Sequence, residues 1–300
     1  MLHPITFSIP KEKMCEGHIV KTKILSSLIP GDTATYIYNT EEEYYNEYKK
    51  SYFAITKRSG GWDCMRHYEI LANGCIPYFI NIEECPKMSL YLLPKDLFIQ
   101  SNMLYDNKFK NKNITDITED ETNEYNILQN HLLEYTKKFL TTDKMAEYIL
   151  KKTNNENVSK ILYLSGDSSP DYLRCATLHG FKTLFGNNCH DSPKIPHIYK
   201  SDSINYANLY GKGFTYTNLL EQTDHNDDLE NTMHEDIKNK YYDIVIYGSY
   251  HRGLPYYDLI CGIYNPGEII LLCGEDINCC NPYNHYDFLR KGHHVFVREL

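Results

Sequence analysis

The segment from residue 51 to residue 80 constrains the fold of this 300-residue chain more than any other part of it. It indicates a strand over 52–56, a basic glycine loop, a helix over 63–73 and a second strand over 76–80. In α/β folds, a glycine loop between a strand and a helix is a common phosphate site, because free N–H groups and the positive end of the helix dipole point outward there. The segment therefore predicts an α/β fold with an anion site near residue 60.

Charged residues in this segment suggest which anion the site would take. The loop combines two cations with two glycines that allow close approach of a ligand, at Lys57, Arg58, Gly60 and Gly61. Arg66 and Glu69 are three residues apart on the predicted helix and so share one face. That face can offer a guanidinium to a diphosphate and a carboxylate to ribose hydroxyls, which indicates binding of a nucleotide sugar. The alternative for this pair is an ordinary helical ion pair, and Lys57 and Arg58 could simply be solvated cations. We expect Asp63 to be the N-cap of the helix.

The same segment resembles the donor site of GT-B glycosyltransferases, most closely the exostosin-like branch. The resemblance rests on the strand from Ser51, the Gly60-Gly61 loop, the pattern Arg66-x-x-Glu69-Ile70-Leu71-Ala72 and the junction Gly74-Cys75-Ile76-Pro77. It implies that Arg66 contacts the donor diphosphate and Glu69 the ribose. Donor domains of this superfamily normally occupy the second half of the chain. Either the acceptor-side domain follows this segment here, or the usual partner domain has been lost.

Strands and helices alternate through most of the chain, which predicts two Rossmann-like parallel-sheet domains. We expect a donor domain at 1–105, a helical linker at 106–157 and an acceptor-side domain at 158–300. Further elements expected in the first domain are a short strand at 5–9, a helix at 20–28, a strand at 35–38, a helix at 41–50 capped by Thr40, and a helix from Pro94 to Leu104.

The second half shows three apolar strands that each end in a loop containing glycine and polar residues. These strands, at 161–164, 243–247 and 269–273, run into the loops 165–170, 248–253 and 274–276, and a last strand follows at 294–297. Carboxyl ends of parallel strands gather at one edge of a sheet, so we expect the three loops to meet the 57–66 loop across one cleft. Candidates for catalysis are His251, Glu275 and Asp276, and further cleft residues are Asp167, Ser249 and Arg252. Helix caps and a tight surface turn are the alternatives for these positions.

Composition narrows the class of protein. The net charge of −9 argues against nucleic acid as a partner, and no apolar run is long enough to span a membrane. No secretory leader is visible, so we expect a cytoplasmic protein whose ten cysteines are reduced. The 28 tyrosines fit AT-rich codon usage, although some could stack on sugars. Structural zinc at the cluster Cys273, Cys279, Cys280, His285, His293 and His294 is a weaker alternative to free cysteines, because no Cys-x-x-Cys pair is present.

Together these features predict a metal-independent glycosyltransferase that moves a sugar from a nucleotide-sugar donor to a hydroxyl of a glycan or glycoprotein, with no bound cofactor. Neither half contains an Asp-x-Asp pair, and arginine with a helix end can replace a cation at the diphosphate. A non-catalytic module that binds sugar nucleotides or glycans remains the main alternative. A methyltransferase is less favoured, because no glycine-rich loop follows the strand at 161–164.

Overall fold

Two parallel sheets form the framework of the protein in a computed structural model that describes residues 1–17, 19–276 and 285–300. The smaller sheet has the order β2-β3-β4, and its strands are Lys23–Leu25 (β2), Ser51–Thr56 (β3) and Ile76–Phe79 (β4). The larger sheet has the order β1-β9-β8-β7-β5-β6. Its strands are Leu2–Pro4 (β1), Ile161–Leu164 (β5), Cys189–Ser192 (β6), Ile244–Tyr247 (β7), Ile269–Cys273 (β8) and His294–Val297 (β9). The predicted α/β class with parallel sheets is confirmed.

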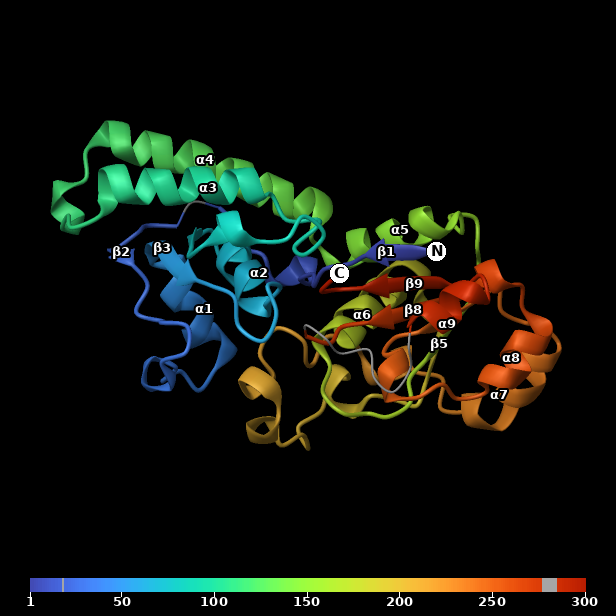
Figure 1. The fold of residues 1–300 in the computed structure, drawn as a ribbon. Coiled ribbons are helices and arrows are strands. Elements are labelled where there is room, and N and C mark those ends of the chain that lie inside the picture. Colours follow the sequence, from blue (N-terminus) through green and yellow to red (C-terminus); the bar gives the residue numbers. More distant parts are fainter. Residues whose placement is uncertain (18, 277–284) are drawn as a thin grey trace.

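Helices connect and cover these strands. The first half holds Glu41–Lys49 (α1), Met65–Ala72 (α2) and Lys95–Leu104 (α3), and Glu119–Phe139 (α4) and Thr142–Thr153 (α5) lead into the second half. That half holds Tyr172–Phe185 (α6), Leu229–Lys238 (α7), Tyr257–Ile263 (α8) and His285–Arg290 (α9). In Figure 1, α3 and α4 lie side by side along the smaller lobe, and α7 and α8 lie together at the far side of the larger one. Among the described residues, no helix combines the length and apolarity needed to cross a bilayer.

Alternating side chains on the larger sheet pack into two separate cores. On β7, Ile244 and Ile246 belong to the core that also contains α5 and α6 residues. Val245 and Tyr247, on the opposite face, pack with residues of α7, α8 and α9. A parallel sheet covered on both faces explains why its strands are continuous apolar runs rather than alternating ones.

Three elements near the N-terminus differ from the predictions. The residues predicted as a helix at 20–28 contain β2, which pairs with β3 because Lys23 aligns with Ser51. The strand expected at 35–38 does not form: Thr35 belongs to a 3-10 turn at Thr33–Thr35, which Asp32 caps, and residues 36–38 are irregular. The strand expected at 5–9 is displaced to Leu2–Pro4.

The displaced strand β1 joins the sheet of the other half. Leu2, His3 and Pro4 pair in parallel with Val295, Phe296 and Val297 of β9, as Figure 1 shows beside the N label. Residues 2–4 therefore lie with the second half and not in the domain predicted at 1–105. The predicted helical linker contains α4 and α5, and Gly180 lies within α6. A Cβ there would clash with the Thr142 carbonyl, so glycine is needed for the close packing of α5 on α6.

Candidate functional site

A cavity of about 600 Å³ lies between the two halves, at the carboxyl ends of strands from both sheets. Residues from the 57–66 loop and α2 form one wall, and the loops that follow β5, β7 and β8 form another. Its volume falls within the range of small-molecule sites. Predicted site residues on its surface are Gly60, Gly61, Arg66, Glu69, Arg252, Glu275 and Asp276. The prediction that the loops of the second half and the 57–66 loop line one cleft is thus confirmed.

The basic part of the glycine loop does not face this cavity. Lys57 and Arg58 are absent from its lining. Nζ of Lys57 lies beside Gly31, and the Arg58 guanidinium stacks 5.7 Å from the centre of the Trp62 ring. Neither cation therefore lines the cavity, and their contact with a ligand stays a prediction.

Gly60 and Gly61 allow close approach of carboxylates from the second half. A Cβ at Gly60 would clash with the Asp276 carboxylate, and one at Gly61 would clash with Glu299. Oε1 of Glu299 also accepts a hydrogen bond of 2.8 Å from the Asp63 amide. The two glycines therefore allow the loop to pack closely against the second half, independently of any role in ligand binding.

Helix α2 begins at Met65, two residues after the predicted start at 63. Its N-cap is Cys64, whose side chain makes no capping hydrogen bond. Asp63 is buried instead and accepts hydrogen bonds from the Phe7 amide at 2.7 Å and the Tyr68 hydroxyl at 2.8 Å. Burial raises the pKa of the Asp63 carboxyl to about 6. The prediction that Asp63 caps the helix is wrong, and the helix start at the cavity has no side-chain cap.

Arg66 is the lining cation with the fewest partners. Its Nε donates a hydrogen bond of 3.1 Å to the Tyr36 hydroxyl. Its Nη1 is buried and makes no hydrogen bond in the described part of the chain. A guanidinium group with a buried nitrogen that has no acceptor favours an anionic partner. Arg66 and the uncapped start of α2 therefore form a candidate anion site.

Glu69 lies on the same wall, one turn further along α2, and is only 6% exposed. Its Oε2 accepts from the Tyr44 hydroxyl at 2.7 Å, and its Oε1 accepts from the Thr215 hydroxyl at 2.6 Å. Burial raises its pKa, against the effect of these hydrogen bonds. An ionised carboxylate has about four acceptor positions, so two remain for further donors.

The loops of the second half meet where the strand order of the larger sheet reverses, between β5 and β7. Asp171, which caps α6, joins them. It accepts from the Ser249 hydroxyl at 2.6 Å and from Nε of Arg252 at 3.2 Å. Burial alone would raise the Asp171 pKa, but the charge and amide of Arg174 bring it below its ordinary value.

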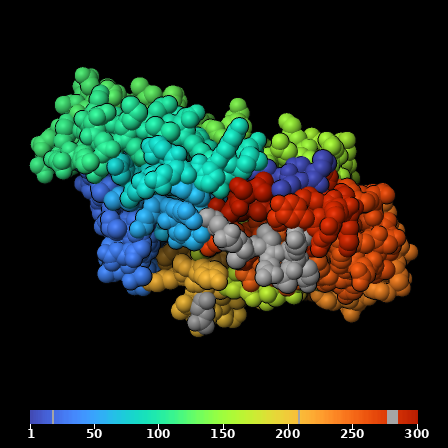
Figure 2. Space-filling view, in the orientation of Figure 1, coloured from blue at the N-terminus to red at the C-terminus, as the bar shows by residue number. Residues whose placement is uncertain are grey.

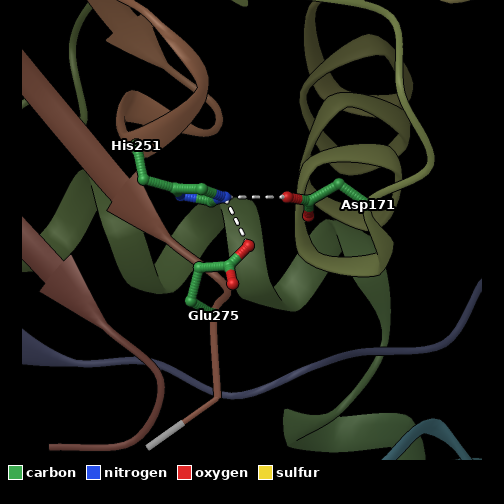
Figure 3. A group of neighbouring side chains, drawn as sticks. All are labelled: Asp171, His251 and Glu275. Atoms are coloured by element: carbon green, nitrogen blue, oxygen red, sulfur yellow. Dashed lines mark ion pairs between the residues drawn. The ribbon is translucent and has the colours of Figure 1, made fainter. Parts of the chain in front are cut away.

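Figure 3 shows the His251 ring with one nitrogen facing the carboxylates of both Asp171 and Glu275. Nε2 of His251 lies 2.6 Å from Oε1 of Glu275 and 3.8 Å from Oδ2 of Asp171. The contact with His251 lowers the pKa of Glu275, so this carboxylate is ionised near neutral pH. Glu275 and Asp171 line the cavity, whereas His251 is not part of its lining.

These three side chains could hold a divalent cation, because one donor atom of each lies within 4.8 Å of the others. Arg252 already balances part of their charge. Its Nε is 3.2 Å from Asp171 and its Nη2 is 3.8 Å from Glu275. A metal ion would have to compete with this guanidinium, so the cluster fits a proton-transfer site better than a metal centre.

Two predicted cleft residues do not reach the cavity, and one catalytic candidate is already paired. Ser249 is buried against Asp171, and Asp167 accepts from the Ser169 amide at 2.9 Å outside the lining. Asp276 reaches the cavity, but it forms an ion pair with Arg298. Of the three catalytic candidates, Glu275 is therefore the one placed to accept a proton from a bound molecule.

Sequence reasoning missed several residues of the cavity. Aromatic rings cover one part of its wall, at Phe7, Tyr36, Tyr38, Tyr44, Tyr172, Tyr210 and Phe214. In a chain with 28 tyrosines, composition gave no way to select these. Asp171 had a local signal, because aspartate is a preferred N-cap residue and here it directly precedes α6. No local sequence signal marked Arg298 or Thr215 as residues of the site.

Comparisons with protein-family models, curated proteins and solved structures found no match for this chain. The zinc alternative falls partly on Cys279 and Cys280, which lie outside the described residues. Two histidines of the proposed zinc cluster contact residues outside it. Nε2 of His293 lies 2.9 Å from the Tyr257 hydroxyl, and Nδ1 of His294 lies 3.1 Å from Nε2 of His3.

Proposed function

We propose that this protein transfers a sugar from a nucleotide-sugar donor to a hydroxyl acceptor, without a metal ion. The observation that carries the proposal is Arg66, whose buried Nη1 has no partner among the described residues in a cavity of about 600 Å³. An arginine in this state suits a phosphate group, since its planar fork can bind two oxygens. The GT-B resemblance of residues 51–80 supports the same ligand class.

In this proposal the donor lies along α2. The diphosphate contacts Arg66 and the first amides of the helix, and the ribose hydroxyls donate to Glu69, one turn away. The sugar then extends toward the carboxyl ends of β5, β7 and β8, where Glu275 lines the cavity. The aromatic wall gives apolar faces on which the base and the sugar can stack.

The reaction would use Glu275 as general base. The acceptor hydroxyl gives its proton to this carboxylate while its oxygen forms a bond to the anomeric carbon. The bond from that carbon to the diphosphate oxygen breaks, and the electron pair leaves with the nucleoside diphosphate. Arg66 and the α2 N-terminus stabilise the charge that develops on the leaving group.

A non-catalytic sugar-nucleotide module is the second candidate, and one contact favours it. The lowered pKa of Glu275 makes this carboxylate a weaker base than an unpaired glutamate. Such a module would bind the donor through Arg66 and leave it intact.

A panel of UDP-, GDP- and dTDP-sugars distinguishes the two candidates. Thermal-shift measurements should show stabilisation by at least one member of the panel, because a ligand that binds the folded state raises the apparent melting temperature. Mass spectrometry should then detect transfer or hydrolysis, and the activity should survive EDTA. Binding without turnover supports the module, full dependence on Mn²⁺ or Mg²⁺ contradicts the metal-free mechanism, and no binding contradicts both candidates.

A further inference from the structure

A segment of the second half crosses to the first half and closes one side of the cavity. This strap, residues 209–218, follows an irregular path between β6 and α7. Nζ of Lys212 donates to the Tyr38 carbonyl at 2.7 Å and to the Asn39 side chain at 2.9 Å. In Figure 2 the gold surface around this strap abuts the blue surface of the first half. Tyr210, Gly211, Lys212 and Phe214 line the cavity.

Thr215 is fully buried at the point where the strap meets the first half. Its amide donates to Oε2 of Glu41 at 2.7 Å, and its hydroxyl lies 2.7 Å from the Tyr45 hydroxyl. The same hydroxyl donates to Oε1 of Glu69 at 2.6 Å. Thr215 thus connects the strap to a carboxylate of the cavity wall.

The backbone of Thr215 has a φ of +76°. A β-branched residue rarely adopts this left-handed conformation, and such strain persists where surrounding contacts enforce it. Glycine would relieve the strain, but it would remove the hydroxyl that reaches Glu69. The combination of a strained backbone and a hydroxyl on a cavity carboxylate indicates a role for the Thr215 side chain itself.

We infer that Thr215 is a positioning residue that orients the Glu69 carboxylate toward a vicinal diol of the ligand. Together with Tyr44, it occupies one acceptor position on each carboxylate oxygen and leaves the others for two donated hydrogen bonds. Adjacent ribose hydroxyls fit this need. The inference rests on the proposed function, and it makes the donor site a joint product of both halves of the chain.

The test compares ribose and 2′-deoxyribose forms of UDP and GDP by calorimetric titration. Wild type should bind a ribonucleotide about tenfold or more tightly than its deoxy form, as the loss of a hydrogen bond to a charged group predicts. Thr215→Val should weaken ribonucleotide binding by about tenfold and leave deoxynucleotide binding within about twofold. Thr215→Ser should retain the preference because it keeps the hydroxyl. Thr215→Gly replaces the valine variant if that protein does not fold.

Thr217→Val is the matched control. Its hydroxyl donates to the Gly213 carbonyl within the same strap, at 2.6 Å, and the substitution should leave the ribose preference unchanged. Adding Thr215→Val to Glu69→Gln should cause no further loss of preference. An unchanged preference in Thr215→Val, or equal weakening of both nucleotide forms, would overturn the inference while the proposed function stands. Absence of nucleotide binding by wild type would overturn both.

Discussion

Replacement of Arg66 by alanine should weaken nucleotide binding and spare the fold. One hydrogen bond to a charged group contributes about 1.5–3 kcal/mol, so the dissociation constant for the nucleoside diphosphate should rise roughly 10- to 100-fold. Arg66 has one neutral partner, the Tyr36 hydroxyl, and a buried Nη1 with none among the described residues. Its removal therefore breaks no ion pair within the described residues, and the free energy of unfolding should fall by less than about 1 kcal/mol or should rise.

Calorimetric titration and urea denaturation of the same protein samples measure both quantities. Arg58→Ala is the matched control, since Arg58 belongs to the same loop but stacks on Trp62 outside the cavity. Tyr36→Phe should weaken binding only several-fold, because it removes one neutral hydrogen bond to Nε. If Arg66→Ala retains wild-type affinity, or Arg58→Ala loses as much, the assignment of the anion site to Arg66 is refuted.

Three further outcomes follow from the contacts described above. Glu275→Gln should lower turnover by about 10²-fold or more and leave nucleotide affinity unchanged, with Asp167→Asn as a neutral control in the same assay. Gly180→Ala should destabilise by roughly 1–3 kcal/mol in urea denaturation because its Cβ would meet the Thr142 carbonyl, whereas Gly262→Ala, in open space, should not destabilise. Burial alone would raise the pKa of Glu47, but hydrogen bonds from Lys23 and Ser27 lower it to about 2. Its stabilising contribution is complete above about pH 4.5 and is lost as the pH falls toward 2, and Glu47→Gln should flatten this part of the stability–pH curve.

Local sequence signals predicted the elements whose contacts are close in the chain. The capping box of Thr40 and Glu43 marked the start of α1, and apolar runs marked β5, β7, β8 and β9. Spacing on one helix placed Arg66 and Glu69 on the same cavity wall. Each of these features depends on residues no more than a few positions apart, so its physical cause was visible in the sequence.

Features set by distant partners were not predictable in this way. Strand β1 has only three residues, too few to show an alternation of apolar and polar side chains. Its strand conformation comes from pairing with β9 at the other end of the chain. The same applies to β2, which exists because β3 provides its hydrogen bonds. Thr215 reaches Glu69 across 146 positions, and no spacing rule covers such a contact. Tertiary pairing overrode the helical pattern at 20–28.

The glycine loop shows how a correct pattern can have a second physical cause. Gly60 and Gly61 were interpreted as room for a phosphate, yet the nearest groups are the carboxylates of Asp276 and Glu299. Arg298 neutralises both, through ion pairs with each. The second half thus supplies its own anions to the loop, and under the proposed function the ligand anion binds further along α2, at Arg66. A substitution at Gly61 would then act first on the docking of the two halves, whereas one at Arg66 would act on the ligand alone.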